Sequence, residues 1–158
     1  MTLVVERLRQ QRVVTISTAP GRLGVNASLR LRSGEHLTVR QLLLGLMLES
    51  ANDAAVALAE AVDSSEAAFV RRMNQRATAL GLTATHYASA HGLDRPGHRT
   101  SARDLARLWT VAMRRADFRA LVATERATIP GPATPSPWRC GPTRRSSRRR
   151  ACSARPPS

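Results

Sequence analysis

The sequence of 158 residues contains no lysine, so all 25 of its basic residues are arginines. Any mechanism that needs a lysine amine as a base or as an anion clamp therefore cannot run in these residues alone. Nucleic-acid binders usually mix lysine with arginine. Arginine alone is more typical of arginine-biased coding than of selection for phosphate binding.

Aromatic residues are also scarce, at 3% of the chain, and both cysteines, Cys140 and Cys152, lie close to the C-terminus. Leucine, valine and alanine therefore have to fill the core. Because the residues before Cys140 include no cysteine, they offer neither a disulfide framework nor a thiolate metal site.

Long apolar runs are missing as well. The longest, Leu42 to Leu48, has seven residues, whereas a helix needs about 20 to span a bilayer. The first five residues are followed at once by Glu6 and Arg7, so the apolar stretch and cleavage site of a secretory signal peptide are absent. As written, the chain is expected to have no transmembrane segment and to remain in the cytoplasm.

The composition changes near Pro130 and predicts two regions. Residues 1–130 are long enough for one domain with its own core. Residues 131–158 are rich in proline and arginine, lack apolar periodicity and are predicted to be a disordered tail. Seven arginines and no acidic residue lie from Arg139 onward, so half of the formal net charge of +14 belongs to this end.

The sequence of residues 1–130 predicts short strands followed by helices. β-Branched or alternating residues predict strands at 13–17 and 28–32. Apolar periodicity and capping residues predict about five helices. The predicted helices follow caps at Thr38 (with Gln41 in a capping box), Ser65, Ser101 and Asp117, with one more over 53–62. A closing strand is predicted at 127–129.

The tripeptide Ser50-Ala51-Asn52 is the candidate site. It lies with Glu49 and Asp53 between two apolar helices, where core packing alone would not place polar groups. A serine hydroxyl can donate and accept a proton, and an asparagine carboxamide can hold a peptide group at both ends. Taken alone, the tripeptide is more simply interpreted as a pair of helix caps.

A longer match around the tripeptide points to a family. The sequence resembles the serine D-alanyl-D-alanine carboxypeptidases, which are low-molecular-mass penicillin-binding proteins of peptidase class S11. The likeness runs in order from residue 1 to about 130. Its matching segments are 37–60, 66–70, 73–74, 79–82, 85–87, 91–94, 97–98 and 101–106.

The resemblance implies an α+β fold and a defined chemistry. The expected structure is the helical portion of a β-lactamase-like DD-transpeptidase domain, mainly α with short β elements and without most of the central sheet. In the family a Ser-x-x-Lys serine attacks the D-Ala-D-Ala bond of a peptidoglycan stem peptide, with its lysine as base, and water cleaves the acyl-enzyme. By resemblance, Ser50 is a catalytic residue that relays a proton, and Asn52 binds the substrate carbonyl. No cofactor is implied; β-lactams are implied ligands.

Two family motifs find no counterpart here. By this resemblance, the residues given are expected to begin just after the Ser-x-x-Lys motif, and the Lys-Thr-Gly strand would follow beyond Pro130. These residues are therefore expected to be a piece truncated at both ends and inactive alone, with a frameshift as one explanation of the tail. The family works outside the cytoplasmic membrane, which this chain has no visible signal to cross.

Alternatives to this interpretation remain open from the sequence. The isoelectric point near 11.8 would suit a nucleic-acid-binding protein, although no nucleic-acid partner is expected, because the charge is concentrated in the tail. A non-catalytic peptidoglycan-binding protein is a third possibility. The spacing of His86, His91 and His98 matches no common zinc pattern, so these histidines are expected to form loop hydrogen bonds rather than a metal site.

Overall fold

The computed structural model describes residues 1–20, 27–129 and 138–140, the last three through their backbone only. The described elements are mainly helices, with two antiparallel sheets of two strands each. This confirms the predicted balance of α and β structure. In chain order they are α1 (Thr2–Arg7), β1 (Val13–Thr15), β2 (His36–Thr38), α2 (Val39–Glu49), α3 (Asn52–Asp63), α4 (Glu66–Ala79), α5 (Ala102–Met113), α6 (Ala116–Val122), β3 (Ala127–Ile129) and β4 (Trp138–Cys140).

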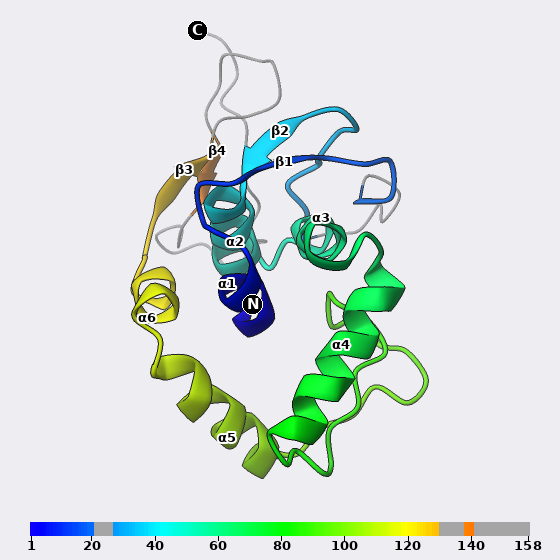
Figure 1. Ribbon diagram of the computed structural model, residues 1–158. Coiled ribbons are helices and arrows are strands. Elements are labelled where there is room, and N and C mark those ends of the chain that lie inside the picture. Colours follow the sequence, from blue (N-terminus) through cyan, green and yellow to red (C-terminus); the bar gives the residue numbers. More distant parts are fainter. Residues whose placement is uncertain (21–26, 130–137, 141–158) are drawn as a thin grey trace, which may run out of the picture.

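Helices α2 and α3 form the centre of the core, below the β1–β2 hairpin (Figure 1). The capping box predicted for α2 is confirmed: Gln41 N–H donates to the Thr38 hydroxyl at 3.2 Å, and Thr38 N–H donates to Gln41 Oε1 at 2.7 Å. All residues of α3 from Asn52 to Ala59 are buried. Because four of these eight residues are alanines, the neighbouring helices α2 and α4 can approach α3 closely.

Helix α4 is joined to the end of α3 by an ion pair. Arg72 Nε donates to both carboxylate oxygens of Asp63, at 2.8 and 2.7 Å. This hydrogen-bonded guanidinium lowers the pKa of Asp63. The predicted start and end of α4 are confirmed, since the Ser65 hydroxyl accepts from Ala68 N–H and Gly81 follows the helix with φ +67°.

The strand predicted at residues 28–32 is wrong. Leu29 and Leu31 are buried and Arg30 is exposed, which produces the alternation seen in the sequence. However, the N–H groups of Leu29 and Leu31 donate to the carboxylate of Asp53 instead of to a strand. The partner of β1 is β2, which pairs with it from Val13↔Thr38 to Thr15↔His36.

Helix α1 is absent from the sequence prediction, and the predicted cap of α6 is wrong. Helix α1 has six residues and no side-chain cap, so the sequence carried no start signal for it. Asp117 does not cap α6; the N-cap is Arg115. Asp117 lies in the first turn, where it binds the Arg115 guanidinium at 2.7 Å and accepts from Phe118 N–H.

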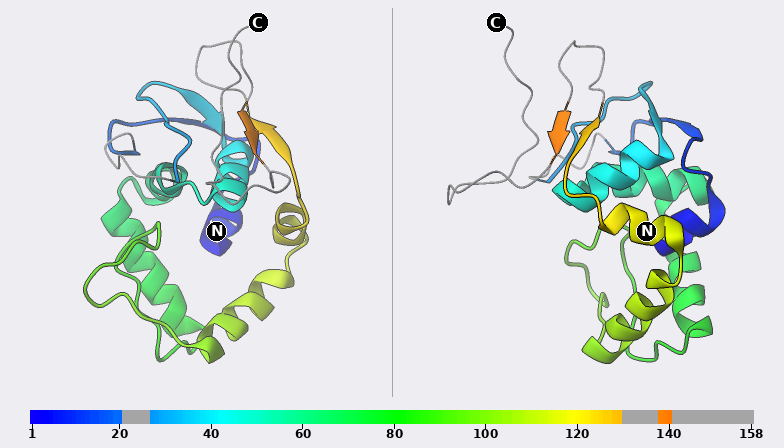
Figure 2. Two further views of the ribbon diagram at one scale, coloured as in Figure 1. Left: turned by 180° about the vertical axis from the view of Figure 1, so that it is seen from behind. Right: turned by 90° about the vertical axis from the view of Figure 1, so that its left-hand side faces the viewer.

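Helices α4, α5 and α6 form an arc around α1 (Figures 1 and 2). Helix α5 begins at the predicted Ser101 cap, whose hydroxyl accepts from Asp104 N–H. Its apolar face is only partly covered: Leu105 and Trp109 are 50% and 54% exposed. An apolar helix face in contact with water favours association with another surface.

The predicted closing strand is present as β3, which pairs with β4. Strand β4 lies inside the region predicted to be disordered, so Trp138–Cys140 are an exception to that prediction. The rest of the tail falls outside the described residues.

Candidate functional site at the α2–α3 junction

Ser50 ends α2 in the left-handed conformation, with φ 56° and ψ 34°, and its side chain is exposed. Its N–H donates to the carbonyl of Gly45. The left-handed region costs a non-glycine residue about 1–2 kcal/mol, and such strain collects at functional sites. Within the described ranges, no hydrogen bond occupies the Ser50 hydroxyl, which therefore remains able to donate and accept.

Asn52 is the first residue of α3 and is only 6% exposed. Its backbone N–H and its Nδ2 both donate to the carbonyl of Ala27, at 2.9 and 3.2 Å. Because one Nδ2 proton makes this bond, the second Nδ2 proton and Oδ1 have no hydrogen-bond partner among the described residues. The contact fixes the carboxamide on a segment 25 residues away in sequence.

This geometry separates the site from ordinary helix capping. The N-cap of α3 is Ala51, which has no side-chain cap hydrogen bond, and Asn52 lies inside the helix. Ser50 is a C-cap only through its backbone. Neither polar side chain is therefore used as the helix cap that the tripeptide alone suggested.

Asp53 is the most highly connected side chain of the junction and is 1% exposed. Its carboxylate accepts from the Ser28 hydroxyl at 2.7 Å and from the N–H groups of Leu29 and Leu31, both at 3.0 Å. It also accepts from Ala54 N–H at 2.9 Å. The acidic residue at this apolar junction is visible in the sequence, but its role is not, because Ser28, Leu29 and Leu31 lie more than 20 residues upstream.

One further contact holds residues 27–31 against the junction, and another shapes the segment itself. The Leu29 side chain lies where a Cβ on Gly45 of α2 would be, so this glycine makes room for it. Arg30 has φ 55°, and its N–H donates to the Ser28 hydroxyl at 2.9 Å. The segment is thus fixed by polar contacts to α3 and by apolar packing on α2.

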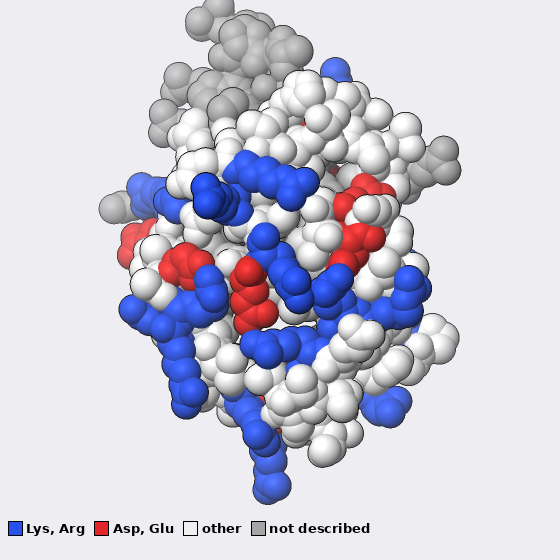
Figure 3. Space-filling model, in the orientation of Figure 1, with Lys and Arg blue, Asp and Glu red and all other residues white. Residues whose placement is uncertain are grey.

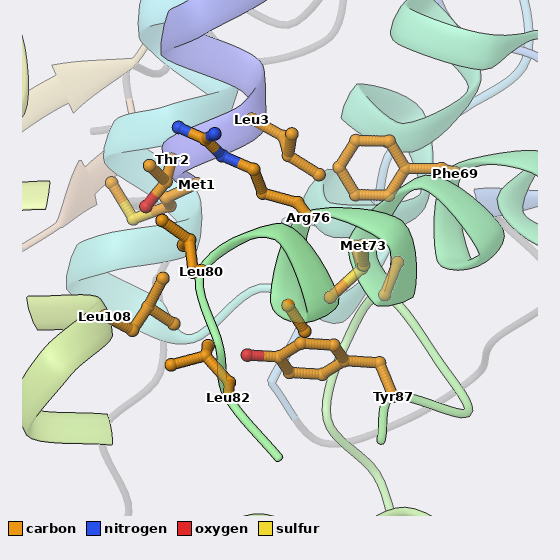
Figure 4. A pocket seen from close by; sticks show the side chains of 12 residues that line it. Met1, Thr2, Leu3, Phe69, Met73, Arg76, Leu80, Leu82, Tyr87 and Leu108 are labelled. Carbon is orange, nitrogen blue, oxygen red and sulfur yellow. The ribbon is translucent and has the colours of Figure 1, made fainter. Parts of the chain in front are cut away.

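A separate apolar cavity of about 230 Å³ lies between α1, α4 and α5 (Figure 4). Neither Ser50 nor Asn52 lines it, so this cavity and the candidate chemistry are in different places. Its lining residues are Met1, Thr2, Leu3, Phe69, Met73, Arg76, Ala77, Leu80, Leu82, Tyr87, Ala90 and Leu108.

Burial in and around this cavity changes two ionisation equilibria. It raises the pKa of Tyr87, with a smaller contribution from the charge of Asp104. It lowers the pKa of the Met1 amine to about 6. Arg76 crosses the cavity and pairs with Glu6 at 2.8 Å.

The loop after α4 contains the three histidines, and the prediction of loop hydrogen bonds is confirmed for two of them. His91 Nδ1 accepts from Leu93 N–H at 3.2 Å, and His98 Nδ1 accepts from Ala88 N–H at 3.3 Å. His86 pairs with Arg99 through the backbone. Across the part of the chain that the structure describes, no group of three or more histidine, cysteine or acidic side chains is arranged to hold a metal.

On the face drawn in Figure 3, arginines are spread widely rather than collected in one patch, and the acidic side chains lie among them in the middle and upper parts of the view. Pairs such as Arg72–Asp63 and Arg115–Asp117 neutralise part of this charge. No helix among residues 1–20, 27–129 and 138–140 combines the length and apolarity that crossing a membrane requires.

Solved structures place this architecture in a known class. The chain is similar to the D-alanyl-D-alanine carboxypeptidase of Mycobacterium tuberculosis H37Rv, with a TM-score of 0.79 and 30% identity over 88% of this chain and 52% of that one. It is also similar to the Streptomyces K15 DD-transpeptidase, with a TM-score of 0.75 and 35% identity over 81% of this chain and 53% of that one. The fold is therefore the helical part of a DD-peptidase, or penicillin-binding, domain.

The D-alanyl-D-alanine carboxypeptidase family model, Peptidase_S11, matches residues 2–130. The chain belongs to this family. A curated relative, D-alanyl-D-alanine carboxypeptidase DacF of Bacillus subtilis, is 45% identical over 76 residues, which are 48% of this chain and 20% of that protein. The chain thus spans about half the length of the solved relatives and a fifth of this curated one.

Proposed function

We propose that this chain supplies one wall of the active site of a serine-type D-alanyl-D-alanine carboxypeptidase acting on peptidoglycan stem peptides outside the cytoplasmic membrane. The observation that carries the proposal is the junction itself, where an exposed serine hydroxyl and an anchored asparagine carboxamide flank one residue. Family membership supports the reaction class, because the model match spans the whole junction.

In this proposal Ser50 and Asn52 have different tasks. Asn52 uses its remaining Nδ2 proton to donate to the carbonyl of the substrate backbone. Ser50 accepts a proton from the general base on Oγ while it donates its own proton to the departing amine. The nucleophilic serine of the family motif gives its proton to the base and bonds through Oγ to the carbonyl carbon, the amide C–N bond breaks, and D-alanine leaves with the proton from Ser50. Water later hydrolyses the resulting ester.

These residues alone are proposed not to complete the reaction. The family base and anion clamp are lysines, and this sequence has none. The purified chain is therefore expected to form no covalent adduct with a fluorescent penicillin, as measured by gel fluorescence and intact mass spectrometry. A stoichiometric mass increase that heat denaturation of the chain abolishes would show that it acylates by itself and would contradict this part of the proposal.

Asn52→Ala tests the binding task directly. We expect N-acetyl-D-alanyl-D-alanine to shift the NMR signals of residues 27 and 50–52 in the ¹⁵N-labelled chain. Loss of one hydrogen bond should weaken this binding by about tenfold in Asn52→Ala. Ser50→Ala should bind about as well as the unchanged chain, because proton relay acts in the reaction rather than in binding.

The L,L stereoisomer of the same dipeptide is the matched control for this titration. Equal shifts with both stereoisomers, or shifts confined to residues away from the junction, would remove the support for a D-Ala-D-Ala site. Circular dichroism of each variant establishes that a lost shift does not reflect a lost fold.

A further inference from the structure

Asp53 lies next to the candidate wall but cannot itself reach solvent, since it is 1% exposed. Its carboxylate receives four hydrogen bonds, of which three come from residues 28–31 and one from Ala54 N–H. Compensating the negative charge of a buried carboxylate would not by itself require several donors from one segment that is distant in sequence. The arrangement instead fixes a loop against a helix end.

The segment that Asp53 holds is the one that anchors Asn52. Ala27 directly precedes Ser28, and its carbonyl accepts hydrogen bonds from the backbone N–H and from the Nδ2 group of Asn52. Movement of residues 28–31 away from α3 would therefore carry the Ala27 carbonyl away from the Asn52 carboxamide. Leu29 supports the same placement by packing against Gly45, five residues before Ser50.

We propose that Asp53 is a positioning residue for the Ser50–Asn52 wall, acting through Ser28 and the backbone of Leu29 and Leu31 to aim the Asn52 carboxamide. The proposal rests on the proposed function and names a further residue of that same site. Asp53 touches no substrate in this scheme. It acts on the substrate carbonyl only through the direction of Asn52.

Asp53→Asn is the first test. An asparagine keeps one oxygen acceptor but presents an NH₂ group where Leu31 N–H needs an acceptor. We expect hydrogen exchange of the Asn52 backbone N–H, measured relative to Leu43 N–H in the same sample, to accelerate by roughly tenfold or more. The two Asn52 Nδ2 proton signals should also move toward each other as the bond to Ala27 weakens.

Asp63→Asn is the matched control, because Asp63 is also a hydrogen-bonded aspartate of α3 but lies at its other end. It should leave the Asn52 exchange ratio and Nδ2 signals unchanged. A merely stabilising role of Asp53 would accelerate Leu43 and Asn52 together and so leave their ratio constant.

Ser28→Ala provides a second variant that removes one contact to Asp53 without changing the carboxylate. It should accelerate Asn52 exchange in the same direction, and Ser28→Thr, which keeps the hydroxyl, should restore it. If Asp53→Asn does not fold, this pair decides the question. Unchanged Asn52 exchange in folded Asp53→Asn, or in Ser28→Ala, would overturn the proposal.

Binding of N-acetyl-D-alanyl-D-alanine separates this proposal from the proposed function. If the unchanged chain shows no stereoselective binding, the proposed function fails, whereas the exchange measurements still report whether Asp53 positions Asn52. If it binds, Ser28→Ala should weaken binding severalfold and Ser28→Thr should recover it. A folded Ser28→Ala with faster Asn52 exchange but unchanged affinity would overturn the functional part of the inference.

Discussion

Replacing Leu43 with alanine is expected to lower the free energy of unfolding by about 2–5 kcal/mol. Leu43 is 0% exposed and lies on α2, which packs against α3, α6 and several short strands. The chain has very few aromatic residues, so leucines contribute much of the buried apolar surface. Truncation would remove buried apolar surface from this core and leave a cavity.

Met47→Ala is the control for this substitution, since Met47 lies one turn further along α2 and is 36% exposed. Urea unfolding followed by circular dichroism should give a loss of about 1 kcal/mol or less for Met47→Ala. If Leu43→Ala leaves too little folded protein to measure, Leu43→Met, which nearly conserves volume, should cost under about 1.5 kcal/mol. Equal losses for Leu43→Ala and Met47→Ala would show that α2 does not bury the face seen in the structure.

The helices that the sequence predicted well are those with local start signals. Thr38, Ser65 and Ser101 each accept a hydrogen bond from a backbone N–H three residues later. Such contacts depend on neighbouring residues alone, so a sequence pattern contains the information needed. Helix α1 has no such cap and depends on the burial of Leu3, Val4 and Val5, which only the folded chain supplies.

The structure of residues 28–32, wrongly predicted as a strand, depends on contacts between residues that are distant in sequence. Alternating Leu29 and Leu31 correctly indicated which side chains are buried. The pattern could not reveal that the backbone donors would go to Asp53, at a separation of more than 20 residues. A side-chain acceptor from another element replaced a neighbouring strand, and hydrophobic alternation does not distinguish the two.

The sequence located the candidate site, but it did not reveal the residues that hold Asn52 and Asp53 in place. The crowding of polar residues near Ser50 indicated the junction, and the structure describes it at the end of α2 and the start of α3. Ser28 and Ala27, which hold the junction through Asp53 and Asn52, carried no recognisable signal. The assigned roles of Ser50 and Asn52 stay predictions.

In a purified chain that starts at Met1, lowering the pH from 8 to 6 is expected to destabilise the fold through the Met1 amine. Burial lowers its pKa from 8.0 to about 6. The unfolded chain therefore binds more protons than the folded chain in this window, so the stability is complete above pH 8 and falls as the pH drops through 6. A difference of this size corresponds to about 2–3 kcal/mol.

His91 extends the same trend to lower pH. Burial, opposed by the charge of Glu66 and assisted by those of Arg95 and His98, lowers the pKa of His91 below its usual value of 6.5. Protonation would also remove the acceptor of Leu93 N–H. Its contribution is complete above pH 6.5 and is lost as the pH falls through the lowered value. Asp63 and Asp117, whose pKa values their arginine partners lower, lose their contributions only in stronger acid.

Urea unfolding at half-unit steps from pH 8.5 to 5 measures this dependence, and N-terminal acetylation isolates its source. The acetylated chain has no amine to titrate, so its stability should be flat between pH 8 and 7 and decline only where His91 titrates. His36→Gln removes an exposed histidine and serves as a control. It should change the dependence of unfolding free energy on pH little. Identical profiles between pH 8 and 7 with and without acetylation would show that the Met1 amine does not have the lowered pKa that its burial implies.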